Sequence, residues 1–287
     1  MTIRRLGLLA GPALFLLIQL LVPEEAMPAG ARSVAAVAAM MAILWMTEAL
    51  PIAVTALLPV VFFPLLGVTD IQGVTANYAH HLVFLFLGGF WIAAAMERSD
   101  AHRRIALHVL RIVGSRMDRV ILGFMAATAF LSMWLSNTAT TMMMLPIALA
   151  VTGRLGDRQC GFSRSLLLGI AYAASIGGIG TPIGTPPNLV FMQVYADQFG
   201  DPPTFPEWMV FGVPVVAVLV PLAGLWLTRG VRLERAVVLP QVGAWQSAEK
   251  RVLAVFALTA LAWVTRRAPF GGWSTWFDLP NASDASV

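Results

Sequence analysis

The sequence predicts an all-α, multi-pass integral membrane protein, on the evidence of its composition, its long apolar runs and the positions of its basic residues. Of the 287 residues, 58% are apolar and 12% are charged, and the mean hydropathy is +0.77. A soluble domain of this size needs a more charged exterior. The basic residues, all arginine except Lys250, cluster between the apolar runs. They therefore indicate membrane topology, not a nucleic-acid-binding surface.

The apolar runs predict about seven membrane spans, each of which needs about 20 helical residues. The apolar runs lie near residues 6–22, 33–66, 82–96, 119–152, 164–196, 208–228 and 249–265. The second run is too long for one crossing, and we expect Pro51 to divide it into two spans. Glu48, close to this break, is interpreted as a capping or interfacial carboxylate. The first run follows Arg4 and Arg5 without a cleavage site, so we interpret it as a span and not a signal peptide.

The basic clusters predict which loops face the cytoplasm of a cell (inner or plasma) membrane. They lie within residues 98–119, 154–164 and 229–251, and the N-terminus is placed on the same side. The loops around residues 24–25, 69–79 and 201–207 are acidic or neutral and are expected outside.

Residues 101–113 are predicted to form an amphipathic helix that lies in the membrane interface. Ile105, Val109, Ile112 and Val113 share one face of this helix, and Arg104, His108 and Arg111 lie elsewhere on it. Such a division into apolar and basic sides is typical of interfacial helices.

The segment 119–152 lies between two basic loops that are both placed inside, so it must enter and leave the membrane on the same face. We therefore predict a re-entrant helical hairpin. Its arms, roughly 119–134 and 138–152, have about 15 residues each and are too short to span the hydrocarbon core. Ser136-Asn137-Thr138 would form the tip, near the middle of the membrane.

The predicted tip favours an anion. A helix that begins at Thr138, with Ser136 or Asn137 as its N-cap, leaves the amides of Thr138, Ala139 and Thr140 without intrahelical partners. The positive end of the helix dipole faces the same space. A carboxylate or another oxyanion is the ligand that this geometry suits.

A second irregular piece, residues 174–188, favours a cation. Its glycines weaken the helix, and Pro186 and Pro187 cannot donate hydrogen bonds to earlier carbonyls. We expect the carbonyls of Gly178, Pro182 and Ile183 to be left free. Free carbonyls and hydroxyls at membrane depth are oxygen ligands suited to Na⁺, and discontinuous helices of this kind recur in transporters.

Three separated motifs carry a family resemblance. They are Trp45-Met-Thr-Glu-Ala-Leu-Pro51, Ser132-Met-Trp-Leu-Ser-Asn-Thr-Ala-Thr-Thr141 and Gly184-Thr-Pro-Pro-Asn188, in this order along the chain. Together they resemble the divalent anion:sodium symporter family, which carries dicarboxylates, citrate or sulfate across the lipid bilayer. The resemblance implies an elevator-type secondary transporter, usually a homodimer, with scaffold and transport domains built from two inverted repeats.

The resemblance also implies roles for the motif residues. A sodium site would use Ser132, Ser136, Asn137 and the backbone of Gly184, and Asn137 and Thr138 would contact a carboxylate of the substrate. Residues 185–188, which are Thr185, Pro186, Pro187 and Asn188, would support the site. Na⁺ would be the coupling ion, and no other cofactor is expected.

The implied domain organisation has three parts. Residues 1–118 would be scaffold spans ending in the interfacial arm helix. Residues 119–228 would be part of the transport domain, with the hairpin at 119–152, a broken helix at 164–196 and a span at 208–228. Residues 229–287 would be a cytoplasmic arm and the start of the second repeat. The family's second hairpin has no counterpart here, since Asn281-Ala282-Ser283 lacks the threonine, so we expect an N-terminal fragment that is inactive alone.

Other functions are weighed against this one. A membrane enzyme needs a nucleophile with a base, or a carboxylate or histidine cluster, inside the apolar region, and a channel needs a continuous pore. Neither pattern is visible in the sequence. The alternative within transporters is a proton-coupled or exchange-type carrier of anions or metalloid oxyanions, which the scarcity of acidic residues in the spans disfavours. The particular anion, the Na⁺ stoichiometry and the choice between symport and exchange stay open.

Overall fold

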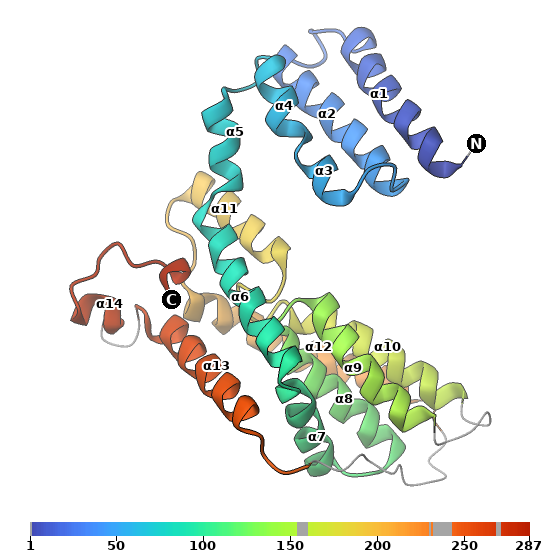
Figure 1. The fold of residues 1–287 in the computed structure, drawn as a ribbon, viewed down its shortest axis with the longest axis vertical. Helices are drawn as coiled ribbons and strands as arrows, with labels where there is room; N and C mark the ends of the chain where they lie inside the picture. Colours follow the sequence, from blue (N-terminus) through green and yellow to red (C-terminus); the bar gives the residue numbers. More distant parts are fainter. Residues whose placement is uncertain (1, 154–159, 230, 232–242, 268–270) are drawn as a thin grey trace. The chain divides into compact units, whose positions relative to one another are not determined.

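The predicted all-α fold class is confirmed over the part of the chain that the structure describes. A computed structural model covers residues 2–153, 160–229, 231, 243–267 and 271–287 (Figure 1). All regular secondary structure in these ranges is helical. The chain divides into two compact units, Met1–Val83 and Phe84–Val287.

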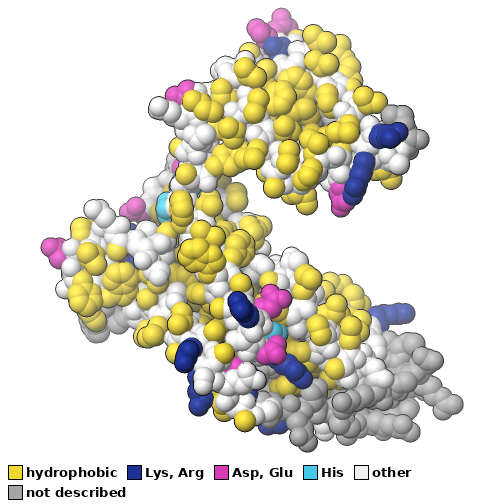
Figure 2. All heavy atoms as spheres, viewed as in Figure 1, with side chains coloured by type: hydrophobic (Ala, Val, Ile, Leu, Met, Phe, Trp, Pro, Cys, Tyr) yellow, Lys and Arg dark blue, Asp and Glu magenta, His cyan; other side chains and the backbone are white. Residues whose placement is uncertain are grey.

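The exterior identifies a membrane protein. Large apolar side chains are exposed along most helices, and Figure 2 shows hydrophobic side chains over much of the visible surface. Among the described residues, four helical segments are long and apolar enough to cross a membrane: Ile3–Leu21, Ala29–Met46, Ile71–Arg98 and Phe205–Thr228. Ile52–Leu65 and Asn137–Thr152 are apolar but shorter. An apolar exterior of this extent is stable only against lipid.

The first unit contains α1 (Ile3–Leu21), α2 (Ala29–Met46), α3 (Ile52–Ala56), α4 (Leu58–Leu65) and α5 (Ile71–Tyr78). Helices α1 and α2 pack side by side, with Gly7 and Gly11 of α1 buried at their contact. A Cβ atom at Gly7 would lie only 2.0 Å from Thr47 Oγ1. Small residues thus allow the close helix approach that membrane helices use in place of a hydrophobic driving force.

Three expectations concern the first unit. The break at Pro51 is confirmed, because α2 ends at Met46 and Pro51 immediately precedes α3. The apolar segment after it, Ile52–Leu65, is shorter than the span that was predicted there. Glu48 is exposed and pairs with Arg4 at 3.5 Å. The interpretation of residues 69–79 as a loop is wrong: most of them form α5, whose N-cap Asp70 accepts a hydrogen bond from the Gly73 amide at 2.7 Å. Asp70 supplies the capping signal that stabilises this helix start.

The second unit is built around one buried helix, α8 (Met117–Ser132), which packs against α7, α9, α10 and α12. Its other helices are most of α6 (His81–Arg98), then α7 (Ala101–Val113), α9 (Asn137–Thr152), α10 (Cys160–Gly177), α11 (Pro186–Phe199), α12 (Phe205–Thr228), α13 (Ser247–Thr265), α14 (Gly272–Trp276) and a short 3₁₀ turn at Asp284–Ser286. Phe124, Met125 and Ile121 on α8 are fully buried. The core of this unit therefore lies along α8, which ends at the predicted tip.

The amphipathic helix predicted at residues 101–113 is α7, but its faces differ from the prediction. Ala106, Leu107 and Leu110 form the buried side, whereas Ile112 is 86% exposed. Arg104 is buried and not solvated. Its guanidinium lies 2.8 Å from the Glu249 carboxylate, donates to the carbonyls of Gly243 and Ala244, and stacks over Trp245.

Glycine sets the distance between α8 and α10. A Cβ atom at Gly177 would lie 2.4 Å from the carbonyl oxygen of Ala129, which is backbone and cannot rotate away. Gly177→Ala should therefore push the two helices apart and destabilise the protein by about 1–3 kcal/mol. Thermal or denaturant unfolding of the purified protein in detergent measures the loss.

Gly88→Ala is the matched control, because Gly88 also lies in a helix but a Cβ atom there meets nothing within 4 Å. This control should be neutral or slightly stabilising, since alanine has the higher helix propensity. Equal effects of the two substitutions would contradict the role assigned to the α8–α10 contact.

Candidate functional site

The hairpin tip lies between two helices of equal length. Helix α8 ends at Ser132, helix α9 begins at Asn137, and the two lie side by side (Figure 1). Ser136 is the N-cap: its hydroxyl accepts from the amide of Ala139 at 3.3 Å, and its carbonyl accepts from the amide of Thr140 at 2.9 Å. The predicted set of free amides is therefore wrong by one position. In the first turn of α9, the amides without a hydrogen-bond acceptor among the described residues are those of Asn137 and Thr138.

The predicted broken helix consists of α10 and α11, separated by residues 178–185. The carbonyl of Gly178, which was predicted to be free, instead accepts a hydrogen bond from Asn188 Nδ2 at 2.8 Å. The carbonyls of Pro182 and Ile183 accept no hydrogen bond from any described residue. The cause is local: the residues four positions later are Pro186 and Pro187, which have no amide hydrogen to donate.

The two helix breaks meet at Ser132. Its hydroxyl lies 2.8 Å from Asn137 Oδ1 and 2.7 Å from the carbonyl of Ala174, and its side chain is fully buried. A Cβ atom at Gly178 would lie 2.4 Å from Asn137 Oδ1. A Cβ atom at Gly184 would lie 2.9 Å from the Ser132 carbonyl and 2.5 Å from that of Gly178. Ser132, Asn137 and Gly184 therefore form one cluster. Positions 178 and 184 are glycine because a side chain at either position would overlap neighbouring atoms.

The remaining predicted residues surround this cluster. Ser136 lies at the tip as the cap of α9, and Thr138, next along the helix, is exposed. Thr185 is the N-cap residue of α11, and the exposed Pro186 and Pro187 begin that helix.

Asn188 is buried and holds the break together. Its side-chain amide donates to the carbonyls of both Gly178 and Thr181 at 2.8 Å. One side chain thereby donates hydrogen bonds to two carbonyls at the break between α10 and α11.

Aromatic residues hold the hairpin against its neighbours. Trp134 stacks on Phe205 with ring centroids 6.0 Å apart and meets Phe256 edge-on at 5.4 Å. The indole of Trp208 donates to the carbonyl of Ile179 at 2.8 Å, and the Thr181 hydroxyl donates to the carbonyl of Met133. Trp208 and Thr181 were not predicted as site residues, because their partners lie 29 and 48 positions away and leave no local pattern.

The cluster has no formal charge of its own. None of its residues is acidic or basic, and no group of three His, Cys, Asp or Glu side chains in the described ranges could hold a metal ion. Its electrostatics come from dipoles: the start of α9 presents positive amides, and the 178–185 segment presents carbonyl oxygens. The arrangement can therefore stabilise an anion and a hard cation side by side.

Comparison with known proteins identifies the family. The family described as "Citrate transporter" (CitMHS) matches residues 42–276. The chain belongs to this transporter family. Sodium-dependent dicarboxylate transporters named SdcS, from Staphylococcus aureus strains NCTC 8325 and COL, are each 38% identical to it over 288 aligned positions. The alignment covers 93% of this chain and 55% of each relative.

This membership confirms the resemblance drawn from the three motifs and assigns the chain to a transporter family and not to an enzyme family. The chain spans about half the length of the curated relatives it matches.

Asn188→Ala should leave the carbonyl of Gly178 without a donor and the carbonyl of Thr181 with only the 3.3 Å bond from the Gly184 amide. A buried polar group that loses its partner costs about 1–3 kcal/mol, so we expect unfolding at a lower temperature and a looser tip. Asn77→Ala is the control, since Asn77 Nδ2 also donates to a carbonyl, that of Gly73, but is exposed. Calorimetry or fluorescence-monitored unfolding in detergent distinguishes them, and a loss no larger than that of the control would contradict the bridging role of Asn188.

Proposed function

We propose that the full-length protein is a sodium-coupled secondary transporter of divalent organic anions. The observation that carries this proposal is the meeting of two helix breaks at Ser132, which contacts both Asn137 at the start of α9 and the end of α10. One break has free amides and the other has free carbonyl oxygens. A buried, uncharged cluster of this kind suits an anion that enters together with its counter-cation. The names of the relatives, sodium-dependent dicarboxylate transporters, support the same chemistry.

The proposed sodium ligands are the oxygens of Ser132, Ser136 and Asn137, with the backbone near Gly184. Ser132 Oγ and Asn137 Oδ1 are already within hydrogen-bond distance, so a small cation can bind both. The unpartnered carbonyls of Pro182 and Ile183 are further oxygen donors on the same break. Carbonyl, amide and hydroxyl oxygens are the ligands that hard cations prefer.

The proposed substrate contacts are Asn137 and Thr138. Their amides are the two free donors at the start of α9, where the helix dipole stabilises a carboxylate. A dianion held at membrane depth is costly in free energy. Sodium binding first offsets this cost, so electrostatics alone couples the two solutes.

The proposed architecture is the first half of an inverted-repeat elevator transporter that works as a homodimer. Helices α8 and α9 have 16 residues each, or about 24 Å at 1.5 Å per residue, against a hydrocarbon core of about 30 Å. This shortfall supports a re-entrant hairpin. Residues 1–118 would belong to the scaffold, 119–228 to the transport domain, and 229–287 to an arm and the next repeat.

Uptake of succinate and of citrate by the complete gene product in proteoliposomes tests the function. We expect uptake to require Na⁺, and Ser132→Ala or Asn137→Ala to reduce it about tenfold or more, because each removes an ion-binding oxygen. Thr152→Ala, at the opposite end of α9, should leave uptake unchanged. Full uptake in choline would reject sodium coupling, and uptake that requires a proton gradient instead would favour the proton-coupled alternative.

Cysteine labelling in intact cells, which exposes the outer face, and in inside-out membrane vesicles, which exposes the cytoplasmic face, tests the topology. In a background without Cys160, Arg116→Cys before α8 and Thr152→Cys at the end of α9 should react with an impermeant maleimide from the cytoplasmic side only, because the positive-inside rule places both ends there. Glu25→Cys should react from outside. Labelling of the first two positions from opposite sides would mean that the segment crosses the membrane once, and the hairpin proposal would fail.

A further inference from the structure

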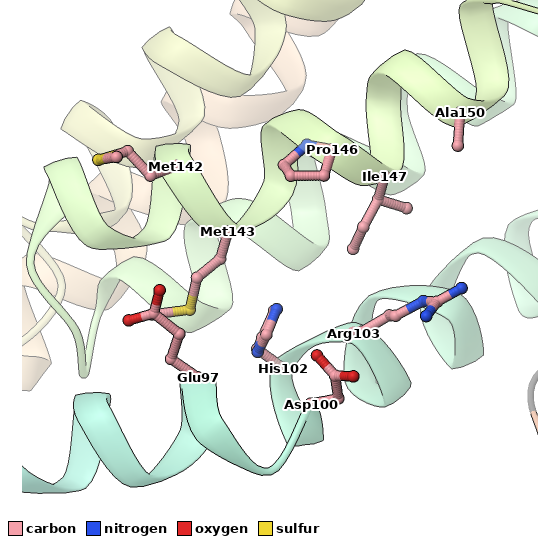
Figure 3. A pocket seen from close by; sticks show the side chains of 9 residues that line it. All are labelled: Glu97, Asp100, His102, Arg103, Met142, Met143, Pro146, Ile147 and Ala150. Atoms are coloured by element: carbon pink, nitrogen blue, oxygen red, sulfur yellow. The ribbon is translucent and has the colours of Figure 1, made fainter.

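A cavity lies in the second unit, at a place not used by the proposed ion and substrate site. It has a volume of about 410 Å³ and lies between the α6–α7 junction and the later part of α9 (Figure 3). This volume is within the range of about 300–1,000 Å³ that small-molecule sites occupy. None of the residues assigned to the sodium or substrate site lines it.

One wall of the cavity is polar and carries charges of both signs. Glu97, Asp100 and Arg103 line it, and none of the three side chains forms an ion pair with another described residue. Figure 3 shows the carboxylates of Glu97 and Asp100 on either side of the His102 ring. These acceptors do not converge as a metal site within the described residues.

His102 supplies an acceptor in the middle of this wall. The residue is only 6% exposed, and its Nδ1 lies 3.1 Å from the carbonyl of Met96. A carbonyl can only accept, so Nδ1 carries the hydrogen and the neutral ring keeps a lone pair on Nε2. Nε2 has no hydrogen-bond partner among the described residues, and the ring points toward α9 (Figure 3).

The opposite wall is apolar. Met143, Pro146, Ile147 and Ala150 of α9 form it. The apolar surface continues beyond the cavity onto Leu149, which is exposed on the same helix. A ligand that fills the space therefore needs a charged part on one side and a hydrocarbon part on the other.

The cavity lies where the hydrocarbon of the membrane ends. Helix α6 is uncharged from Leu82 to Met96 and then presents Glu97 and Arg98. The amphipathic α7 follows immediately, and α9 ends two residues beyond Ala150. Charged groups that begin at the end of an apolar helix mark the headgroup region of a bilayer.

We propose that this cavity binds the headgroup of a zwitterionic aminophospholipid with a phosphoethanolamine group. The primary ammonium donates N–H hydrogen bonds, and Glu97, Asp100 and His102 Nε2 are acceptors spread along the wall, so the ammonium binds one or two of them at a time. The phosphate binds the guanidinium of Arg103, and the acyl chains follow the apolar face of α9. A choline headgroup has no N–H to donate, so it binds more weakly. This proposal concerns binding alone and does not depend on which solute is transported.

Native mass spectrometry of the full-length protein tests the site. With phosphatidylethanolamine, phosphatidylcholine and phosphatidylglycerol of identical acyl chains, phosphatidylethanolamine should be retained preferentially. The double variant Glu97→Gln/Asp100→Asn should reduce its preference over phosphatidylcholine about fivefold, as expected for two partly exposed ion pairs. Asparagine is chosen at position 100 because Asp100 has a φ of 56°, which asparagine tolerates.

Two further variants separate the site from the rest of the surface. Glu25→Gln removes an exposed carboxylate in the first unit and should leave the preference unchanged. Ala150→Trp fills the cavity without altering any charge and should abolish preferential retention. Equal retention of the ethanolamine and choline lipids, a preference for phosphatidylglycerol, or a preference that survives both Ala150→Trp and the double variant would overturn the proposal.

Discussion

The requirement that every backbone amide and carbonyl find a partner in an apolar environment governs the second unit. Where α8 and α10 end inside the protein, side chains replace the missing helical bonds: Ser136 caps α9, Asn188 bridges two carbonyls, and Trp208 satisfies a third. The groups without a partner among the described residues include the amides of Asn137 and Thr138 and the carbonyls of Pro182 and Ile183. Unpaired groups of both polarities thus remain at the two helix breaks.

Close packing of glycines turns this requirement into a defined geometry. Gly177, Gly178 and Gly184 approach Ala129, Asn137 and Ser132 so closely that a Cβ atom would overlap backbone or side-chain atoms. The tip is therefore fixed by contact between main chains, not by long flexible side chains. Fixed dipoles of this kind can stabilise charge without reorganising, which suits the proposed ion site.

Features with a local cause were predictable from the sequence. Ser136 as a cap, the break at Pro51, the free carbonyls before Pro186 and Pro187, and the helix over residues 101–113 all depend on neighbours within a few positions. The errors have separate causes. The free amides differ from the prediction by one residue because α9 begins at Asn137. Arg104, expected on the basic side of its helix, is buried because it pairs with Glu249, which is 145 positions away. No periodic pattern within α7 signals such a partner.

Composition, proline positions and capping residues were enough to specify a helical membrane protein and its two interrupted helices, because each follows from hydropathy or from hydrogen bonds within one turn. The family was indicated by the resemblance of three motifs. Folding in three dimensions was needed to join the interruptions at Ser132, to bury Arg104 against Glu249 and to form the cavity beside His102. These features arise from contacts between helices distant in the chain, whose distances depend on packing and not on the order of residues.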